Sequence, residues 1–323
     1  MCTAISYHAD SHYFGRNLDL EYSYGEKIVI TPRCYPIQFR NMPSVEKHFA
    51  MIGMAIIADA YPLYYDATNE KGLSMSGLNF PGNAHYNPVI SGLNNISPFE
   101  LIPWILCQCQ SVKEARNLLD KLNLVDLPFN NDLPLTPLHW LLADQDASIV
   151  VEPLNDGLHV YENPVGVLTN SPPFPYHIQN LCNYKNLGTG DAGNNFSDQI
   201  QLSSYSRGMG AIGLPGDLSS SSRFIRATFT KLNSVSDETK NGSISQFFHI
   251  LDSVSMVQGC VKVQDRFEKT QYASCCDTNA GVYYYTTYGN RQITGISLTN
   301  CELDSTALQS FPLQRTEQIR MEN

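Results

Sequence analysis

The sequence has no run of basic residues and no long apolar segment. Its 323 residues include 21 Lys and Arg against 31 Asp and Glu, which gives a formal net charge of −10. Phosphate binding draws on clustered Lys and Arg, so this balance argues against a nucleic-acid partner. The longest apolar stretch, Phe49 to Ala60, is too short to span a bilayer. No basic segment followed by an apolar run follows Met1, so a signal peptide is not expected either.

Paired metal-ligand spacing is also missing. The nine cysteines, at positions 2, 34, 107, 109, 182, 260, 275, 276 and 301, include no C-x-x-C pair. We therefore expect reduced thiols, no zinc site, no cofactor and a cytoplasmic location. His8 and His12 are four residues apart, but they lie in a predicted strand-turn-strand segment, where that spacing is not expected to bring them to one face.

Aromatic and β-branched residues are abundant, with 18 Tyr and 14 Phe, and favour extensive sheet. Alternating patterns between turn formers predict early strands at Thr3–Tyr7, Tyr13–Leu20, Lys27–Thr31, Met51–Ile57 and Gly72–Phe80, with a tyrosine-rich turn at Tyr61–Tyr65. Later strands are predicted at His139–Asp144, Ser148–Glu152, Leu158–Tyr161, Gly166–Thr169, Gln271–Cys276, Val282–Tyr288 and Gln292–Leu298.

Helix-start signals separate these groups of strands. Ser97 and Ser111 each precede a Glu three residues later, which is the spacing of a capping box. The second box opens a helix through about Leu122. Further helices are predicted from Ser222 to about Leu232 and from Ser243 to about Val257, the latter with Ser243 and Gln246 as its capping box. The segment from Lys185 to Ser222 is long, polar and Gly-rich, which is typical of a functional or assembly loop. The order of strands and helices fits two sheets packed together with helices outside.

The first residues combine a nucleophile and a base. Cys2 follows the initiator methionine, and removal of Met1 would leave a thiol and a free α-amine on one residue. Such groups have ordinary pKa values of about 8.5 and 7.7–8.0, so both titrate near neutral pH. A pairing of Cys2 with a histidine such as His139 or His177 is an alternative. His139 lies in an apolar stretch that is more simply explained as a core strand.

Five separated segments together resemble the choloylglycine hydrolase family, which includes bile salt hydrolases and penicillin V acylases. They are MCTAI with FGRNLD (14–19), NEKGL (69–73) with GLNFP (77–81), VLTNSP (167–172), GLPGD (213–217) with SRF (222–224), and TQY (270–272). The resemblance covers essentially the whole chain. It implies an α+β fold, a four-layer αββα sandwich of two mostly antiparallel sheets, formed as one domain by residues 2–323.

The resemblance also implies residue roles near the N-terminus. Cys2 would be the nucleophile and its α-amine the base. Asp19 would hold that amine, and Arg16 would lie near the sulfur and favour the thiolate. Residues 16 and 19 of one strand point to opposite faces unless the strand bends. We therefore expect a bend near Asn17 if both side chains reach one site.

Further catalytic positions follow from the same resemblance. Amide hydrolysis builds negative charge on the carbonyl oxygen, which fixed donors stabilise. Asn79 and Asn170 match the family positions for this task, and Arg223 matches the remaining site arginine. Each asparagine follows a predicted strand and precedes a proline-containing turn, a setting in which Asn is also an ordinary turn former.

The implied activity is cleavage of the amide bond in glycine- and taurine-conjugated bile salts. Asn79 favours bile salt hydrolases within the family, where penicillin V acylases tend to carry tyrosine. Leu18, Phe129 and Leu133 are candidates for the wall that would contact the steroid. The alternatives are an acylase acting on penicillin V or N-acyl homoserine lactones, and a bile-acid-binding protein without activity. A homotetramer is expected from the family, with the 185–222 loop as a candidate contact.

Overall fold

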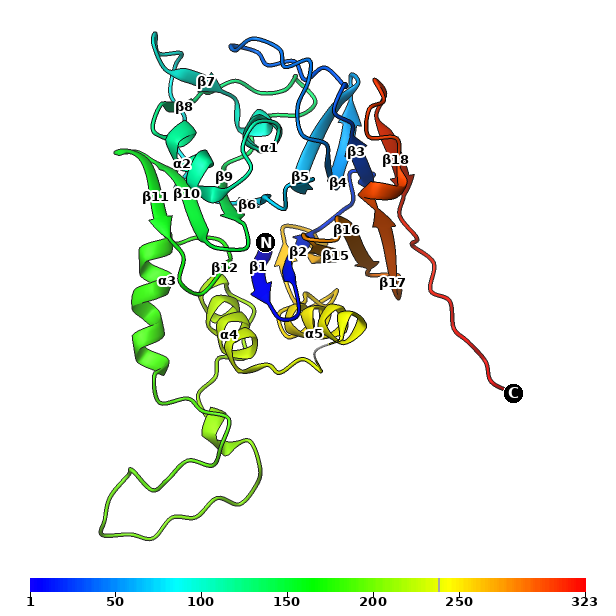
Figure 1. The fold of residues 1–323 in the computed structure, drawn as a ribbon. Coiled ribbons are helices and arrows are strands. Elements are labelled where there is room, and N and C mark those ends of the chain that lie inside the picture. Colours follow the sequence, from blue (N-terminus) through cyan, green and yellow to red (C-terminus); the bar gives the residue numbers. More distant parts are fainter. Residues whose placement is uncertain (238) are drawn as a thin grey trace.

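The computed structural model describes residues 1–237 and 239–323. Two large sheets form the centre of the fold (Figure 1). The six-stranded sheet contains, in spatial order, β12 (Val167–Leu168), β1 (Cys2–His8), β2 (His12–Leu20), β15 (Lys269–Asp277), β16 (Val282–Thr287) and β17 (Asn290–Ser297). The eight-stranded sheet contains β11 (Gly157–Glu162), β10 (Ser148–Leu154), β9 (Leu138–Ala143), β6 (Ser74–Asn79), β5 (Tyr61–Asn69), β4 (Met51–Ala58), β3 (Lys27–Thr31) and β18 (Gln309–Pro312).

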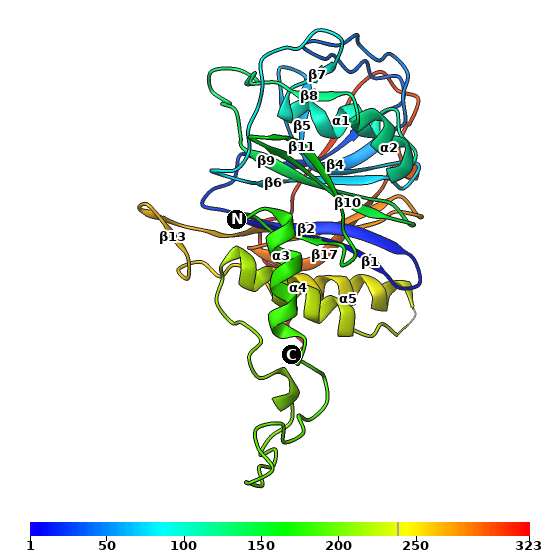
Figure 2. The same ribbon diagram turned by 90° about the vertical axis from the view of Figure 1, so that its left-hand side faces the viewer.

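Neighbouring strands in both sheets are antiparallel, as the sequence predicts. Helices lie outside the two sheets, so the layers run helix, sheet, sheet, helix (Figure 2). The helices are α1 (Leu101–Leu106), α2 (Val112–Leu119), α3 (Phe174–Leu181), α4 (Ser220–Asn233) and α5 (Lys240–Asp252), and α1 packs on β5 and β6 while α5 packs on β2 and β15. Smaller elements are the strand pairs β7 (Asn94–Ile96) with β8 (Leu122–Leu124) and β13 (Lys262–Val263) with β14 (Arg266–Phe267), and the 3₁₀ turns η1 (Pro98–Glu100), η2 (Cys182–Tyr184), η3 (Met209–Ala211) and η4 (Leu298–Asn300). The predicted αββα sandwich is confirmed.

Strand residues bury side chains on both faces of the eight-stranded sheet. In β3, Ile28 and Ile30 belong to the core between the sheets, and Val29 belongs to the core under α1 and α2. Side chains alternate between the two faces of a strand. A strand covered on both faces is therefore apolar throughout, which explains the run KIVIT.

One predicted turn is wrong. Tyr61–Tyr65 begins β5, and the turn lies just before it, where Asp59 and Ala60 have φ of 47° and 60°. Two residues with positive φ match the twist of a hairpin. Pro62 is tolerated in β5 because it pairs only with β4 there, and the pairing with β6 begins at Asp66.

Three helix boundaries and one helix also differ from prediction among the described residues, and one of these boundaries is the end of α5 at Asp252, where it was predicted near Val257. The cap of α5 is Thr239, whose side chain accepts from the Gly242 N–H, and Ser243 lies inside the first turn. Leu122 lies in β8 and not in α2, which ends at Leu119. The helix α3, after Pro173, was not predicted. None of the helices in the described residues has the length and apolar character needed to cross a membrane.

Register shifts interrupt the pairing of β4 with β5, of β2 with β15 and of β16 with β17 in the described residues, and the first two are β-bulges beside the N-terminal hairpin. In β5, Met54 pairs with Asp66 and Ala55 with Tyr64, so Tyr65 is an extra residue. In β15, Asp19 pairs with Thr270 and Leu18 with Tyr272, so Gln271 is extra. Bulges bend a strand and redirect the groups beside them. Both lie next to β2: the carbonyl of Tyr65 bonds to Arg16, and Gln271 follows the partner of Asp19.

His8 and His12 form a cross-strand pair in the β1–β2 hairpin, and their rings stack with centroids 4.8 Å apart. They do share a face, contrary to the expectation from their spacing. His12 is buried and its nitrogens bond the hydroxyls of Ser6 and Thr278, at 2.9 and 3.0 Å. Burial, with the nearby charge of His8, lowers the pKa of His12 from 6.5 to about 3.

We expect His12 to make folding sensitive to acid. The unfolded chain takes up a proton near pH 6.5 and the folded chain does so only near pH 3, so stability falls as the pH drops between these values. Between pH 7 and pH 4 the loss should be about 3 kcal/mol. The H12Q variant lacks the titrating group, so urea unfolding at pH 7, 5.5 and 4 should show a flatter dependence. Parallel curves for the two proteins would contradict this assignment.

Candidate active site

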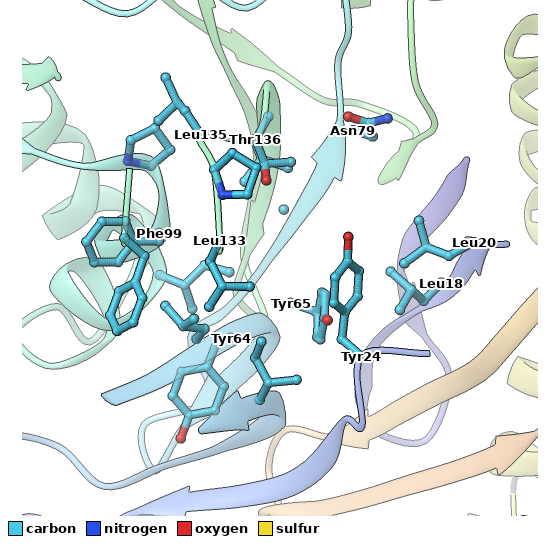
Figure 3. A pocket seen from close by; sticks show the side chains of 18 of the residues that line it. Leu18, Leu20, Tyr24, Tyr64, Tyr65, Asn79, Phe99, Leu133, Leu135 and Thr136 are labelled. Atoms are coloured by element: carbon cyan, nitrogen blue, oxygen red, sulfur yellow. The ribbon is translucent and has the colours of Figure 1, made fainter. Parts of the chain in front are cut away.

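A cavity of about 340 Å³ opens beside the start of β1 and the end of β2, where Cys2, Leu18 and Leu20 line it. Most of its wall is apolar, and Figure 3 shows side chains from several loops and strands converging on it. The three residues predicted to contact substrate, Leu18, Phe129 and Leu133, all line this cavity. Cys2, Arg16 and Asn79 line it as well. The structure thus brings a thiol, a guanidinium and an amide to one apolar cavity.

Cys2 is the first residue of β1 and is 2% exposed. It pairs with Leu18 across the strands, and Ala4 pairs with Arg16, so these four residues share one face of the hairpin. Met1 is present, so the Cys2 nitrogen is a peptide amide, and it donates to Asn170 Oδ1 at 2.8 Å. After removal of Met1, the α-amine would begin at this position.

Arg16 and Asp19 point to opposite faces of β2, and the predicted bend near Asn17 is wrong. The register of β1 with β2 is unbroken from Cys2–Leu18 to His8–His12. Arg16 reaches the eight-stranded sheet, where it donates to the carbonyl of Gly77. Asn17 points the other way and donates to the Leu251 carbonyl of α5. The irregularity is instead the bulge at Gln271 in β15, beside Asp19.

The Arg16 guanidinium is fully buried and only partly bonded. Nη1 donates to the carbonyls of Gly77 and of Tyr65, the bulged residue, whereas Nη2 has no partner. Burial lowers the pKa of Arg16, but the charges of Cys2, Tyr272 and the nearby Asp66 outweigh it, so the net shift is upward. Arg16 is therefore a permanent positive charge on the wall that also holds Cys2.

The Asp19 carboxylate is buried on the helix side of the hairpin. Thr270 Oγ1 donates to Asp19 Oδ1 at 2.6 Å, and Oδ2 has no partner. Burial raises the pKa of Asp19, while Arg223 and the chain terminus oppose the shift. The Met1 ammonium donates to the Asp19 carbonyl at 2.7 Å and pairs with Glu268 Oε1. With Met1 in place, the Asp19 side chain makes no bond to the Cys2 nitrogen.

Asn170 is the hub of the polar contacts. Its Oδ1 accepts from the Cys2 nitrogen and from Arg223 Nη2, each at 2.8 Å, and its Nδ2 donates to the Asn79 carbonyl at 2.7 Å. All its side-chain hydrogen-bonding directions but one are thus in use. The Asn79 side chain, by contrast, makes no hydrogen bond to the described residues and lines the cavity. Asn79 is the amide left free to bind a ligand.

Arg223, on α4, joins the helix layer to the start of the chain. Its guanidinium is fully buried and donates to the Cys2 carbonyl, to Thr3 Oγ1 at 2.7 Å and to the Leu218 carbonyl at 3.1 Å, besides Asn170. Burial lowers the pKa of Arg223, and the charges of Asp19 and Cys2 oppose this. The guanidinium still carries its charge at neutral pH, because arginine titrates so far above it.

Sequence reasoning missed two members of this cluster. Thr270 lies in the segment TQY that contributes to the resemblance, yet its bond to Asp19 depends on the adjacent bulge. Glu268 gave no signal, because a lone carboxylate far along the chain is usually solvent-exposed. Among the described residues, no group of three or more His, Cys, Asp or Glu is placed to hold a metal ion.

Two antiparallel sheets between helix layers, with a cysteine at the start of a central strand facing a cavity, define the class of N-terminal nucleophile hydrolases. Within this class the chain belongs to the choloylglycine hydrolase family of linear amide C–N hydrolases, whose model matches residues 2–311.

Known relatives agree over nearly the full length. The chain is 54% identical to the bile salt hydrolase/transferase of Lactiplantibacillus plantarum over 98% of both proteins, and 35% identical to the conjugated bile acid hydrolase of Lactobacillus acidophilus over 96% of this chain and 100% of that protein. It is also similar to the crystal structure of the C2A mutant of the Clostridium perfringens conjugated bile acid hydrolase, with a TM-score of 0.92, 36% identity and complete coverage of both chains. Penicillin V acylase from Agrobacterium tumefaciens shares the fold, with a TM-score of 0.76 and 19% identity over 97% and 92% of the two chains.

We expect loss of the Arg223 guanidinium to destabilise the protein strongly. The variant R223M would remove four donated hydrogen bonds and leave Asp19 without its nearby cation, so the free energy of unfolding should fall by about 3–5 kcal/mol. The control is R226M on the same helix, which loses only bonds to the carbonyls of Pro215, Asp217 and Ser253 and should cost about 1 kcal/mol. Urea denaturation of both variants tests this, and equal losses would contradict it.

Proposed function

We propose that this protein hydrolyses the amide bond of glycine- and taurine-conjugated bile salts through the thiol of Cys2. The observation that carries the proposal is the position of Cys2 on the wall of an apolar cavity, beside Arg16 and the free amide of Asn79. Membership of the linear amide hydrolases supplies the reaction type. The substrates named for several relatives, bile salts and conjugated bile acids, support the choice of substrate.

The reaction begins after Met1 is removed. The Cys2 α-amine takes the thiol proton, and Sγ attacks the carbonyl carbon of the substrate amide. Arg16 favours the thiolate through its positive charge. Collapse of the tetrahedral intermediate breaks the C–N bond, and the ammonium proton passes to the departing amine of glycine or taurine. Water then hydrolyses the thioester with the α-amine as base, which releases the bile acid and restores the thiol.

The negative charge of the intermediate needs donors that are already in place. Asn79 Nδ2 is the side-chain amide that is free and faces the cavity, so we assign it as the oxyanion donor. Such a donor is worth roughly 3–4 kcal/mol of barrier. Asn170, the other predicted donor, has its Nδ2 on the Asn79 carbonyl. In this geometry it orients Asn79 and the Cys2 nitrogen, and its second Nδ2 hydrogen is the one direction that is still unused.

Asp19 and Arg223 support the nucleophile from the helix side. With Met1 removed, the new ammonium of Cys2 lies near the buried carboxylates of Asp19 and Glu268, which favour its charged form. Arg223 holds the Cys2 carbonyl and Asn170 together. The N-terminal residue is thereby held on both sides of its Cα.

The cavity wall suits a rigid apolar acyl group. Leu18, Phe129 and Leu133 belong to different parts of the wall, and Phe99 packs edge-on against Phe129 with ring centroids 5.2 Å apart. Ligand cavities usually bury most of such a group and leave polar ends near the rim. The steroid would fill the cavity, and the carboxylate or sulfonate of the amino acid would remain near its mouth.

Penicillin V and N-acyl homoserine lactones remain the alternative substrates. The shared fold with penicillin V acylase at 19% identity supports no substrate assignment. Asparagine at position 79 favours the bile salts. A bile-acid-binding protein without activity is the third possibility, and the complete set of polar groups around Cys2 argues against it.

The test is incubation with glycocholate, taurocholate and penicillin V, with measurement of the free amine or free acid released. We expect release from the bile salts. The C2A variant should have no activity, and N79A should lower kcat roughly 10²–10³-fold. Release only from penicillin V would select the alternative substrate, and binding without release would select the non-enzymatic protein.

Intact mass should show that Met1 is missing from the active protein, and activity with Met1 retained would contradict the base assigned here.

For assembly we propose a homotetramer, and a cytoplasmic location stays a prediction of the sequence. The segment between α3 and α4 extends far from the sheets (Figure 1). It exposes large apolar side chains, including Phe196 at 84% and Tyr205 at 86%. Exposed apolar side chains gathered on one segment often mark a protein contact.

We expect the segment between α3 and α4 to carry the contact between subunits. Replacing residues 192–206 by a short Gly-Ser linker should convert the tetramer to a smaller species in light scattering. The double substitution F196S/Y205S should weaken the tetramer in the same direction, whereas V235S, at an exposed site outside the loop, should not. Tetramers that persist in both loop variants would count against this contact.

A further inference from the structure

Two buried histidines hold the backbone of the turn that carries Asn170. We propose that His139 and His177 are positioning residues of the reaction, acting through the consecutive carbonyls of Thr169 and Asn170. Neither touches the cavity, and neither is a partner of Cys2. The inference rests on the proposed function, because it assigns how Asn170 is held beside the nucleophile.

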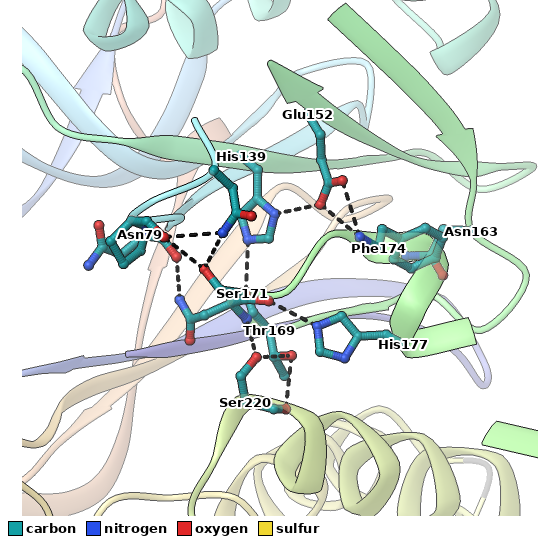
Figure 4. Close-up of polar contacts among 12 residues, drawn as sticks. Asn79, His139, Glu152, Asn163, Thr169, Ser171, Phe174, His177 and Ser220 are labelled. Atoms are coloured by element: carbon teal, nitrogen blue, oxygen red, sulfur yellow. Dashed lines mark hydrogen bonds and ion pairs between the residues drawn. The ribbon is translucent and has the colours of Figure 1, made fainter. Parts of the chain in front are cut away.

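His139, on β9, connects the eight-stranded sheet to this turn (Figure 4). Its Nε2 lies 3.0 Å from the Thr169 carbonyl, which can only accept, so Nε2 carries a hydrogen. Its Nδ1 lies 2.9 Å from Glu152 Oε1, and both carboxylate oxygens accept from the Phe174 N–H at 3.1 Å. The ring stacks on Phe80 with centroids 4.1 Å apart. His139 therefore has fixed contacts on both nitrogens and on its face.

His177, on α3, holds the next carbonyl. Its Nε2 lies 2.9 Å from the Asn170 carbonyl, so this nitrogen also carries a hydrogen. Nδ1 is buried and has no partner among the described residues, and burial lowers the pKa of His177 from its usual 6.5, which favours the neutral ring at neutral pH. The ring stacks on Phe224 of α4, with centroids 4.8 Å apart. Among the described residues, the hydrogen bond from Nε2 to the Asn170 carbonyl is therefore the polar contact through which His177 acts.

The backbone of Asn170 is fixed from the other side as well. Its N–H donates to Ser220 Oγ at 2.8 Å, and Thr169 Oγ1 bonds the same residue at the start of α4. With its N–H and C=O both held, the Asn170 side chain has one direction, toward Cys2, Arg223 and Asn79. Loss of a histidine would let the turn shift, and a displacement of about 1 Å at a reacting group can cost 10²-fold in rate.

A purely structural reading makes a different prediction. Buried histidines commonly satisfy nearby carbonyls without any bearing on chemistry, and their loss then lowers stability alone. A positioning residue lowers kcat, leaves KM nearly unchanged because the cavity wall is intact, and recovers when a donor is returned to the same place. A glutamine amide can place its nitrogen near the position of a histidine Nε2, so His→Gln keeps the donor and His→Leu removes it.

The first experiment compares H177L with H177Q by measuring kcat and KM for glycocholate and taurocholate, together with thermal unfolding. We expect H177L to lower kcat 10–100-fold, as losses in supporting contacts of a site do, with KM within about twofold, and H177Q to recover most of kcat. The control H12Q alters a buried histidine at the far end of the β1–β2 hairpin and should leave kcat unchanged. Unchanged kcat in H177L, or equal losses in H177L and H177Q, would overturn the assignment.

The second experiment treats His139 together with Glu152, because removing one alone would leave its buried partner without a hydrogen bond. H139L/E152M and H139Q/E152Q both replace the pair, and only the second keeps a donor for the Thr169 carbonyl and an acceptor for the Phe174 N–H. We expect the first to lose at least tenfold more kcat than the second. Equal kcat in the two variants would overturn the inference for His139.

The rate of Cys2 alkylation by iodoacetamide separates this inference from the proposed function, because it needs no substrate. Slower alkylation in H177L than in H177Q supports the positioning role, and equal rates oppose it. If the wild-type protein releases nothing from bile salts, the proposed function fails, while the alkylation rates still decide the role of the histidines.

Discussion

The pairing of β1 with its neighbours is the constraint on which the site depends. β1 lies between β12 and β2 in the interior of the six-stranded sheet, so the first residues of the chain form a central strand. Pairing with Leu18 of β2 on one side and the hydrogen bond from its nitrogen to Asn170 on the other fix the position of Cys2. The same register puts Arg16 on the cavity face beside it and Asp19 on the helix face. A cysteine near a chain end, where fraying is common, is made rigid in this way.

Buried charge is the cost of this arrangement, and the surrounding backbone offsets it. Arg16, Arg223, Asp19 and Glu268 are all nearly inaccessible to solvent. Isolated charges in such positions would be strongly destabilising. Here the guanidiniums donate mainly to carbonyls and the carboxylates accept from Thr270 and the chain terminus. Arg16 Nη2, Asp19 Oδ2 and Glu268 Oε2 have no hydrogen-bond partner among the described residues. Unused hydrogen-bonding capacity of this kind is consistent with a site that binds a ligand.

Both bulges serve the site, although neither is visible in the sequence pattern. The extra residue Tyr65 turns its carbonyl toward Arg16, and the extra residue Gln271 leaves Thr270 opposite Asp19. The Asn170 turn depends likewise on side chains from three other elements. In each case a residue of the N-terminal hairpin meets a residue more than forty positions away: Arg16 meets Tyr65, Asp19 meets Thr270, and Cys2 meets Asn170.

Most strands and the layering were predictable because alternating burial and turn residues are local properties, whereas the antiparallel order came from the family resemblance. The errors arose where local signals compete. Tyr61–Tyr65 looked like a turn because of Pro62, but one-sided pairing makes that proline harmless. Ser243 looked like a cap because its spacing fits, yet Thr239 starts the helix one turn earlier. The bend expected near Asn17 was inferred from two roles assigned to one strand and not from the residues themselves.

By itself, the sequence determined the fold class and the family and pointed to Cys2 as the candidate nucleophile, because a cysteine after Met1 and five ordered segments are present in the chain. It also named the asparagines and arginines that gather around Cys2. Only the tertiary structure decided which atoms are committed and which are free. Asn170 donates from its side-chain amide to the Asn79 carbonyl, and Asp19 points to the opposite face of β2 from Arg16. His139 and His177 hydrogen-bond the carbonyls of Thr169 and Asn170 in the turn. These outcomes depend on strand register, bulges and the meeting of distant elements, and no short stretch of sequence encodes them.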